Sequence, residues 1–301
     1  MNPWSTLAPY GKTLSLPGGG ATKGGELFYY DSAKNDDSSD KPTLILVPGL
    51  GDEADTWRHV FLPLVNAGYR VIAPDLPGFG RSIWKGRITM NCHFNAVVKL
   101  LTMAASPECP AVLIGSSLGA GISEMAASMR PDLVKSLILI DGCFPLSGKL
   151  EMGFFLMSLP FLGRSWYRGF RKNHEGAWKS LYPYYNDIEA LDARDREFLR
   201  ERVIARVESS NQERGFFSTT RSMCLFVMLR KKDVAKKVKN YPGKINMIWG
   251  ENDRIIPLDK TDIIRRLRPD INLSLISGAG HLPHQERPGE TAAAILQFLK
   301  G

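Results

Sequence analysis

The sequence predicts an α/β fold with a mostly parallel sheet of eight strands and helices on both faces. Short apolar runs bounded by turn residues alternate with segments of helical periodicity, which is typical of parallel sheets. Five of these runs are almost entirely apolar, as expected for strands that are covered on both faces. The chain has 301 residues, of which 44% are hydrophobic and 23% charged. This is an ordinary globular composition, and the length is sufficient to bury a substantial core.

Eight segments account for the predicted strands. Residues 12–16 and 26–30 flank a glycine-rich turn and predict an opening antiparallel pair. The five mainly apolar runs predict parallel strands and lie at residues 43–47, 70–73, 111–114, 136–140 and 245–249. Residues 272–276 are partly polar, so we expect this last strand to lie at an edge of the sheet.

The predicted helices lie between and after these strands. Apolar residues recur at helical spacing over residues 56–67, 89–106, 118–129, 259–267 and 289–299. Pro131 and Pro269 come just after two of these helices, where proline cannot continue a helix. The spacing of strands and helices suits crossover connections between parallel strands.

Residues 145–238 interrupt the alternation of strands and helices. They contain no apolar strand run, they are helix-prone and basic, and they are rich in aromatic residues. We interpret them as a helical cap inserted between the fourth and fifth apolar strands, so that residues 1–144 and 239–301 form the core. Residues 152–162 are apolar but are broken by Pro160, and we expect them to form a cap helix that lines a pocket.

The net charge of +8 comes from one part of the chain. Residues 147–240 hold nineteen Lys and Arg against eleven Asp and Glu, a difference of eight that equals the whole surplus. The basic residues are interleaved with acidic ones, which is typical of a solvated helix face, and no nucleic-acid-binding motif is found. We therefore expect no nucleic-acid partner, and membrane contact through the basic stretch is the less favoured alternative.

The cysteines and the first residues of the chain bear on its compartment. Cys92, Cys109, Cys143 and Cys224 show no metal-binding spacing and are expected to be buried, small apolar side chains in a reducing compartment. The first residues lack the features of a signal peptide, and no apolar run approaches the ~20 residues that span a bilayer. We expect a cytoplasmic protein that uses no metal or cofactor. The sequence does not determine its oligomeric state.

One turn carries the clearest chemical signal. Gly-Ser-Ser-Leu-Gly at residues 115–119 follows the apolar run 111–114 and leads directly into the helix 118–129. A G-x-S-x-G turn between a strand and a helix places its serine at a strained apex, where the glycines provide room. The dipole of the following helix favours negative charge at that point. Ser117 is therefore the candidate nucleophile.

A serine hydroxyl needs a base to remove its proton and a carboxylate to orient that base. His281 follows the last strand through a flexible Gly-Ala-Gly loop and is the candidate base, with His284 as the alternative. We interpret the other histidines as surface or cap residues: His59, His93 and His174.

The orienting carboxylate is expected on the same edge of the sheet as the base. Asp253 follows the strand 245–249 and is the candidate, with Glu251 and Asp141 as alternatives. Asp141 ends the strand 136–140, where we expect it to cap a turn before the inserted helices.

A tetrahedral oxyanion also requires two preorganised N–H donors. The amide of Leu118, directly after the nucleophile, is one candidate. The other is the amide of Leu50, in the glycine-rich loop that follows the strand 43–47.

Five motifs together resemble the α/β-hydrolase fold, in its capped, cofactor-free esterase and haloperoxidase-like branch, over residues 42–299. They are VPGLG at 47–51, PDLPGFGRS at 74–82, GSSLG at 115–119, WGEND at 249–253 and GHLPHQERP at 280–288. The resemblance implies the chain order serine, aspartate, histidine. It assigns the segment 75–82 to the shaping of a loop rather than to catalysis.

One departure from the family pattern affects the loop that contains Leu50. The family usually has His-Gly after the first parallel strand, where this chain has Pro48-Gly49. That histidine forms structural hydrogen bonds and takes no part in the chemistry. The departure leaves hydrolysis possible and the loop conformation open.

The expected activity is that of a serine hydrolase that cleaves a carboxylic ester or related acyl bond of a small apolar acyl or aryl substrate. Serine at position 117 disfavours haloalkane dehalogenases and most epoxide hydrolases, which resemble this chain but carry aspartate there. Carbon–carbon bond hydrolases, lactonases, thioesterases and perhydrolases use the same three residues and stay as alternatives. A non-hydrolytic ligand receptor is the alternative from a different class.

Overall fold

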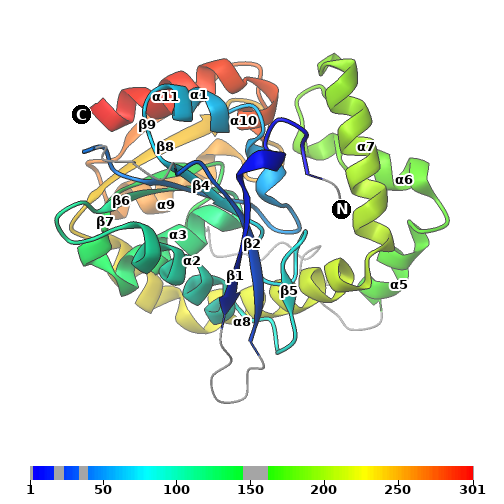
Figure 1. Ribbon diagram of the computed structural model, residues 1–301, viewed down its shortest axis with the longest axis horizontal. Helices are drawn as coiled ribbons and strands as arrows, with labels where there is room; N and C mark the ends of the chain where they lie inside the picture. The colour runs from blue at the N-terminus through cyan, green and yellow to red at the C-terminus, as the bar shows by residue number, and fades with distance from the viewer. Residues whose placement is uncertain (1–2, 17–23, 34–39, 145–161, 301) are drawn as a thin grey trace.

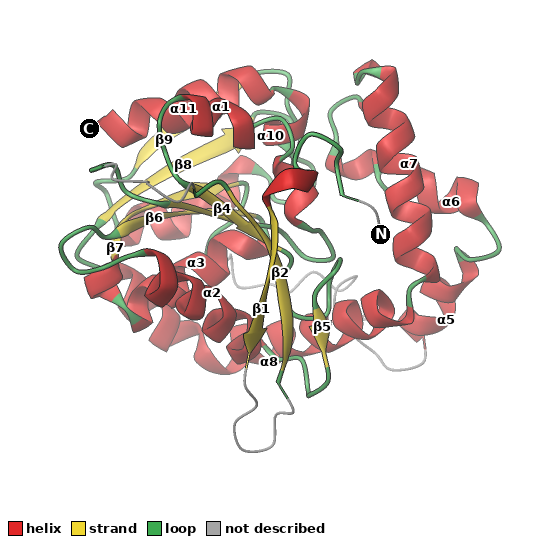
Figure 2. Ribbon diagram, in the orientation of Figure 1, coloured by secondary structure: helices red, strands yellow, loops and turns green. Residues whose placement is uncertain are grey.

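A central β-sheet organises the computed structural model, in which helices lie above and below the strands (Figure 1). The structure describes residues 3–16, 24–33, 40–144 and 162–300. Figure 2 shows the alternation of strand and helix that the apolar runs predict.

The described residues form nine strands in the order β1-β2-β4-β3-β6-β7-β8-β9, with β5 paired to β2. The strands are β1 (Gly11–Leu16), β2 (Gly25–Asp31), β3 (Leu44–Val47), β4 (Val71–Pro74), β5 (Ile83–Trp84), β6 (Ala111–Ser116), β7 (Val134–Ile140), β8 (Lys244–Gly250) and β9 (Asn272–Ile276). β1 and β2 are antiparallel, and β3, β4 and β6 to β9 run parallel.

The predicted fold class is confirmed, with one difference in the number of strands. All eight predicted strands are present, and β9 lies at an edge as expected. The ninth strand, β5, has only two residues, which is too short for any periodicity to reveal it.

Helices cover both faces of the sheet (Figure 1). One face packs against α1 (Phe61–Asn66) and α11 (Pro288–Lys300), and the other packs against α2 (Met90–Ala104) and α3 (Leu118–Met129). α9 (Asp262–Leu267) and α10 (Pro283–Glu286) are short. Two predicted helices are split, because the 3₁₀ turns Ala54–Trp57 and Leu258–Thr261 precede α1 and α9.

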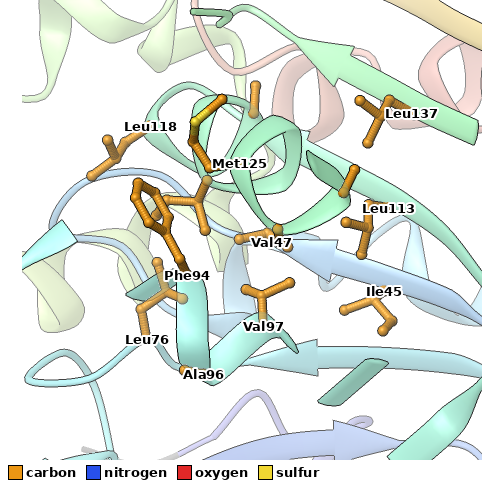
Figure 3. Close-up of a cluster of buried hydrophobic side chains, with 14 of the residues drawn as sticks. Ile45, Val47, Leu76, Phe94, Ala96, Val97, Leu113, Leu118, Met125 and Leu137 are labelled. Atoms are coloured by element: carbon orange, nitrogen blue, oxygen red, sulfur yellow. The ribbon is translucent and has the colours of Figure 1, made fainter. Parts of the chain in front are cut away.

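Alternating side chains of each parallel strand enter opposite cores. Ile45 and Val47 pack with Leu113 and Leu137 under α2 and α3, as Figure 3 shows. Leu44 and Leu46 belong to the core on the other face. Because side chains alternate across a strand, burial on both faces favours apolar residues at successive positions. This explains the mainly apolar runs of the sequence.

From residue 162 onward, the stretch between β7 and β8 forms helices joined by turns. It contains α5 (Leu162–Gly169), α6 (His174–Lys179), α7 (Ala193–Glu208), α8 (Ser210–Asn240) and two 3₁₀ turns. α5, α6 and α7 stand to one side of the sheet, and α8 returns from them to pack against α2, α3 and α9 (Figure 1). The division into core and cap stays a prediction. The expected cap helix 152–162 lies outside the described residues except for the first residue of α5.

His93 of α2 is fully buried, so the prediction that it lies at the surface or in the cap is wrong. Its Nε2 atom lies 2.8 Å from Thr219 Oγ1 of α8, and its ring stacks on Phe79 at 5.9 Å between centroids. The burial arises because α8 folds back over α2, a long-range contact that helical periodicity cannot reveal.

The four cysteines are free thiols. Cys92, Cys143 and Cys224 are buried as expected, but Cys109 is exposed. Its N–H bonds to Ser106 O in a short turn before β6, which keeps it outside the core.

Within the part of the chain that is described, no helix combines the length and apolar character needed to cross a bilayer.

Two buried histidines predict a loss of stability in acid. His284 of α10 is also fully buried, with Nε2 2.8 Å from Thr56 Oγ1, and burial lowers the pKa of both His93 and His284 to about 3. The unfolded chain takes up these protons below about pH 6.5 while the folded protein does not, so stability falls as the pH drops below that value. The expected loss is about 2 kcal/mol per histidine between pH 7 and pH 5.

The measurement is the free energy of unfolding in urea at several pH values, for the wild type and for His93→Gln/His284→Gln. Glutamine places an amide near each Nε2 position but does not titrate. We expect a flatter pH dependence for the variant. Parallel curves for the two proteins would show that these histidines are not its source.

Candidate active site

The turn between β6 and α3 holds Ser117 in a strained conformation. β6 ends at Ser116 and α3 begins at Leu118, and Ser117 between them has φ 53° and ψ −121°. A positive φ is costly for a residue with a side chain, on the order of 1–3 kcal/mol. The Ser117 N–H donates to Ile140 O at 2.8 Å, which ties the turn to the end of β7.

The glycines on either side of Ser117 are required by the packing. A Cβ atom at Gly115 would lie 2.3 Å from Gly119 O, and one at Gly119 would lie 2.2 Å from Val47 O. Neither distance is compatible with a side chain. The turn at residues 115–119, which we call the elbow, closes on itself and approaches β3 only because both positions lack a Cβ.

Ser117, His281 and Asp253 form one hydrogen-bonded chain of side chains. His281 Nε2 lies 2.9 Å from Ser117 Oγ, and His281 Nδ1 lies 2.8 Å from Asp253 Oδ2. His281 and Asp253 are both buried. Asp253 Oδ1 accepts from the amides of Ile255 and Ile256 at 2.8 and 2.9 Å, which leaves Oδ2 for the imidazole.

Residues from the inserted stretch hold the loop that carries His281. The His281 N–H donates to Tyr184 O at 2.8 Å. Glu286 accepts from the amides of Gly280 and Asn186, both at 2.7 Å, and so joins the loop to the insertion. Sequence reasoning assigned no role to Glu286, although it lies in the motif 280–288 that supports the family resemblance.

The alternative residues for the base and the carboxylate make other contacts. His284 bonds to Thr56 and its ring lies 4.5 Å from that of Trp57, so its Nε2 is occupied inside the core. Glu251 is exposed and accepts from Ser277 Oγ at 2.8 Å. The structure brings neither side chain into the chain of hydrogen bonds at Ser117.

Asp141, at the end of β7, lies against Asp253 and is fully buried. It has φ 46°, and its Oδ1 accepts from the Gly250 N–H at 2.8 Å. Burial and the charge of Asp253 raise the pKa of Asp141 well above its usual range. Both effects favour the protonated form of Asp141, which can donate a hydrogen bond toward Asp253, a contact beyond the turn-capping role expected from the sequence.

Among the described residues, Asp141, Asp253 and His281 also form a group whose side chains could ligate a metal ion. One donor atom each from Asp141, Asp253 and His281 lies within 4.8 Å of the others. The direct 2.8 Å contact between His281 and Asp253 is shorter than the ~3.4 Å that separates two ligands of one tetrahedral ion. The arrangement fits hydrogen bonding rather than shared coordination.

The loop after β3 approaches the candidate nucleophile closely. A Cβ atom at Gly49 would lie 3.3 Å from Ser117 Cβ, which places this loop and the neighbouring Leu50 beside the elbow. Leu118 is the first residue of α3, so its amide has no intrahelical partner.

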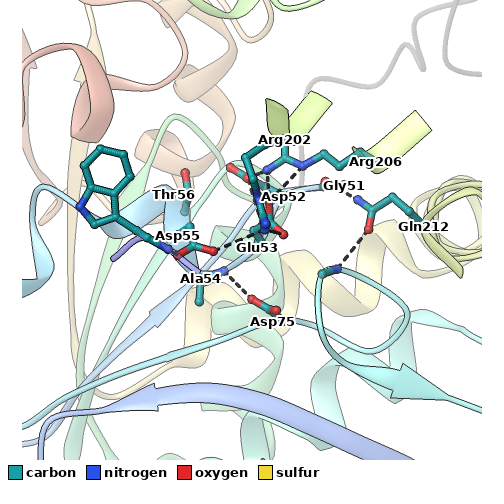
Figure 4. Close-up of polar contacts among 12 residues, drawn as sticks. Gly51, Asp52, Glu53, Ala54, Asp55, Thr56, Asp75, Arg202, Arg206 and Gln212 are labelled. Carbon is teal, nitrogen blue, oxygen red and sulfur yellow. Dashed lines mark hydrogen bonds and ion pairs between the residues drawn. The ribbon is translucent and has the colours of Figure 1, made fainter. Parts of the chain in front are cut away.

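Gln212 of α8 holds the loop that follows β3. In this loop the family usually has a histidine before the glycine, where this chain has Pro48. Gln212 Nε2 donates to Gly51 O at 2.6 Å, and its Oε1 accepts from the Gly80 N–H at 3.1 Å (Figure 4). Gly51 itself has a left-handed φ of 76°. Sequence reasoning missed Gln212, since only the tertiary fold brings α8 to this loop.

A buried network of ion pairs joins the same loop to α7 (Figure 4). Arg202 Nε donates to Glu53 Oε1 at 2.7 Å, and Arg206 Nη2 reaches both Glu53 and Asp52 at 2.7 and 2.5 Å. Burial lowers the pKa of Arg202 to about 9, so it stays charged at neutral pH. These arginines lie within the basic stretch that the sequence suggested was a solvated face, and here they pair with acids of the core.

Asp75 completes the polar framework around the loop. Its carboxylate accepts from the Ala54 N–H and from the Arg81 N–H, both at 2.7 Å. These bonds join the loop after β4 to the loop after β3, in agreement with a structural role for the segment 75–82.

Comparison with known proteins agrees with this fold. A model of the alpha/beta hydrolase fold matches residues 42–288. The chain therefore belongs to the α/β-hydrolase fold family, and it is a hydrolase.

The proteins similar to this chain include esterases. The uncharacterized hydrolase YugF of Bacillus subtilis is 28% identical over 284 residues, covering 93% of this chain and 96% of that protein. A pimeloyl-(acyl-carrier protein) methyl ester esterase of Methylococcus capsulatus is 28% identical over 262 residues, covering 86% and 94%. The solved structure of a thermophilic esterase from Thermogutta terrifontis is similar in fold, with a TM-score of 0.74 and 20% identity over 96% of this chain and 98% of that one.

The buried ion-pair network leads to a prediction about stability. We expect Arg202→Met to lower the free energy of unfolding by about 3 kcal/mol, because the buried Glu53 carboxylate loses a positive partner. Arg200→Met, on the same helix, removes an exposed pair with Glu175 and should change stability by less than about 1 kcal/mol. Urea unfolding of both variants is the measurement, and equal losses would contradict the proposed importance of the network.

Proposed function

We propose that this hydrolase is a serine hydrolase that cleaves a carboxylic ester or related acyl bond. The observation that carries the proposal is the chain of hydrogen bonds from Ser117 Oγ through His281 to Asp253. A serine placed in this way is activated by an adjacent base that a carboxylate orients. Membership of the family and the methyl ester esterase among its relatives support the same reaction class.

The proposed reaction passes through an acyl-enzyme. His281 Nε2 takes the Ser117 proton as Oγ attacks the carbonyl carbon, and Asp253 stabilises the imidazolium that forms. The amides of Leu50 and Leu118 donate to the oxyanion. The tetrahedral intermediate then collapses, and His281 gives its proton to the leaving alcohol. Water, activated by His281, repeats these steps to release the carboxylic acid and restore Ser117.

The neutral form of Asp141 suits this mechanism. A protonated Asp141 can donate a hydrogen bond to Asp253 without adding a second negative charge beside it. The Asp253 carboxylate is then held by two backbone amides, His281 and Asp141. We propose that Asp141 is a positioning residue for Asp253.

We propose that the inserted helices form a cap over an apolar acyl or aryl substrate. Phe216 of α8 reaches the loop that contains Leu50, since a Cβ atom at Gly51 would lie 3.3 Å from its ring. The neighbouring cluster contains further aromatic side chains: Tyr167, Trp178, Tyr185 and Phe217. Aromatic walls beside an acyl-binding loop favour apolar substrate groups. The cytoplasm stays the proposed compartment.

Replacement of the nucleophile is the most direct test. We expect Ser117→Ala to lower kcat for p-nitrophenyl esters by at least about 10³-fold, because the attacking oxygen is lost. Ser116→Ala is the matched control: this neighbouring serine is buried and its hydroxyl lacks a hydrogen-bond partner within the described structure, so activity should be retained.

A fluorophosphonate probe extends this test to covalent chemistry. Labelling should be found at Ser117 in the wild type and in Ser116→Ala, and should be absent in Ser117→Ala. Undiminished hydrolysis by Ser117→Ala would refute the proposed mechanism. A folded wild type that is neither labelled nor active would favour a ligand receptor instead.

The two neighbouring aspartates should respond differently to the same substitution. Asp253→Asn removes the acceptor for His281 and should lower kcat by about 10⁴-fold. Asp141→Asn preserves a neutral group with the same acceptor for the Gly250 N–H and an N–H₂ donor for Asp253, so kcat at pH 7 should change by less than about tenfold. Steady-state kinetics of both variants are the measurement. A similar loss in both would mean that Asp141 acts as a charged group.

A further inference from the structure

The second half of α8 presents an apolar surface to solvent. Leu225, Met228 and Leu229 are 58%, 64% and 77% exposed, the highest values among the large apolar residues that the structure describes. They lie three and four residues apart, so they share one side of the helix. Exposed apolar side chains in a group indicate a contact surface rather than chance.

Basic residues continue the same side of α8 toward its C-terminus. Lys232, Lys236 and Lys239 follow Leu225 by 7, 11 and 14 residues, which is helical spacing, and all three are exposed. Val234 and Val238 are buried on the opposite side, against the core. We call the outward side the α8 face, defined by Leu225, Met228, Leu229, Lys232, Lys236 and Lys239.

The charge around the α8 face is almost entirely positive. Arg230, Lys231 and Lys237 are also exposed, so residues 230–239 present six basic side chains. The one acidic residue in this range, Asp233, pairs with Lys237 at 3.7 Å. This departs from the interleaved charges that make the basic stretch as a whole resemble a solvated face.

A groove adjoins the apolar end of the α8 face. It has a volume of about 410 Å³ and lies between α2, α3 and α8. Leu225 and Leu229 line it together with Met129, which is itself 45% exposed at the end of α3. The apolar surface therefore extends across two helices, and the charged residues that line the groove are Arg230, Asp233 and Lys237.

We propose that the α8 face binds the surface of an anionic phospholipid bilayer. Apolar side chains followed by lysines on one helix side match a membrane interface, in which acyl chains lie beneath negatively charged headgroups. Leu225, Met228 and Leu229 would enter the acyl-chain boundary. The lysines would contact lipid phosphates, and their long side chains allow them to reach across the interface.

The charge and the apolar residues of the α8 face distinguish an anionic bilayer from a second copy of the chain and from a nucleic acid. A second copy would bring the same positively charged surface, which opposes pairing. A nucleic acid would match the lysines but would leave the three aliphatic side chains in water. An anionic bilayer satisfies both parts of the α8 face. The inference goes beyond the proposed function, because none of these residues belongs to the site at Ser117.

Vesicle co-sedimentation of the full chain tests the proposal. We expect binding to phosphatidylcholine vesicles that contain phosphatidylglycerol, weaker binding at high salt, and little binding to phosphatidylcholine alone. Lys232→Glu/Lys236→Glu/Lys239→Glu should weaken binding at least tenfold. Leu225→Ser/Met228→Ser/Leu229→Ser should also weaken it and should leave a residual binding that high salt abolishes.

The control variant reverses the charge of three exposed lysines outside the α8 face by substitution with glutamate: Lys135, Lys172 and Lys300. This variant has the same net charge as the lysine variant and should keep most of the binding. Far-UV circular dichroism and hydrolysis of a soluble p-nitrophenyl ester should match the wild type in all three variants. These readouts separate a failure of membrane binding from a failure of folding or of the proposed function.

Three results would overturn the proposal. The first is a wild type that does not bind anionic vesicles. The second is an equal loss of binding in the control and in the lysine variant, which would indicate net charge alone. The third is a change of oligomeric state in the serine variant with unchanged vesicle binding, because the face would then be covered by a second copy.

Discussion

The close packing of backbone around Ser117 is the constraint on which the rest of the structure depends. A Cβ atom at Gly142 would lie 2.2 Å from Ser117 O, and one at Gly119 would lie 2.2 Å from Val47 O of β3. Three parallel strands therefore end at one point with almost no space between their loops. This crowding maintains a φ of 53° that an isolated serine would avoid. It also brings the loops after β3 and β7 against the candidate nucleophile.

The helices between β7 and β8 add a second constraint, because residues of this stretch form hydrogen bonds to the loops that follow the strands. Tyr184 accepts from the loop of His281, Asn186 is joined to that loop through Glu286, and Gln212 holds the loop of Leu50. Arg202 and Arg206 supply buried positive charge to the acids that follow that loop. The loops after the strands thus carry the candidate catalytic side chains, while helices between β7 and β8 hold the backbone around them. A change in α7 or α8 would therefore be transmitted to the site without touching its side chains.

Much of the fold could be predicted because its signals are local. Strands covered on both faces must be apolar throughout, and a strand-to-helix turn with two glycines identifies Ser117 from a few residues. The predictions fail where the sequence pattern is short or where the outcome depends on residues far away in the chain. β5 has two residues, Cys109 lies in a turn, and His93 is buried only because α8 crosses it. Gln212 and Arg202 are ordinary polar residues in a basic helical stretch, and nothing beside them in the sequence indicates their partners.

The sequence by itself determined the class of fold, the order of its elements and the residue types able to perform the chemistry, since these follow from periodicity and short motifs. The tertiary structure alone decided which of them meet. Ser117 and His281 are separated by 164 positions, and their 2.9 Å contact exists only once the parallel strands align their ends. It also decided that Asp141 is buried against Asp253 and that Leu225, Met228 and Leu229 of α8 are exposed among the described residues. Burial and exposure depend on contacts across the whole chain, which no local pattern encodes.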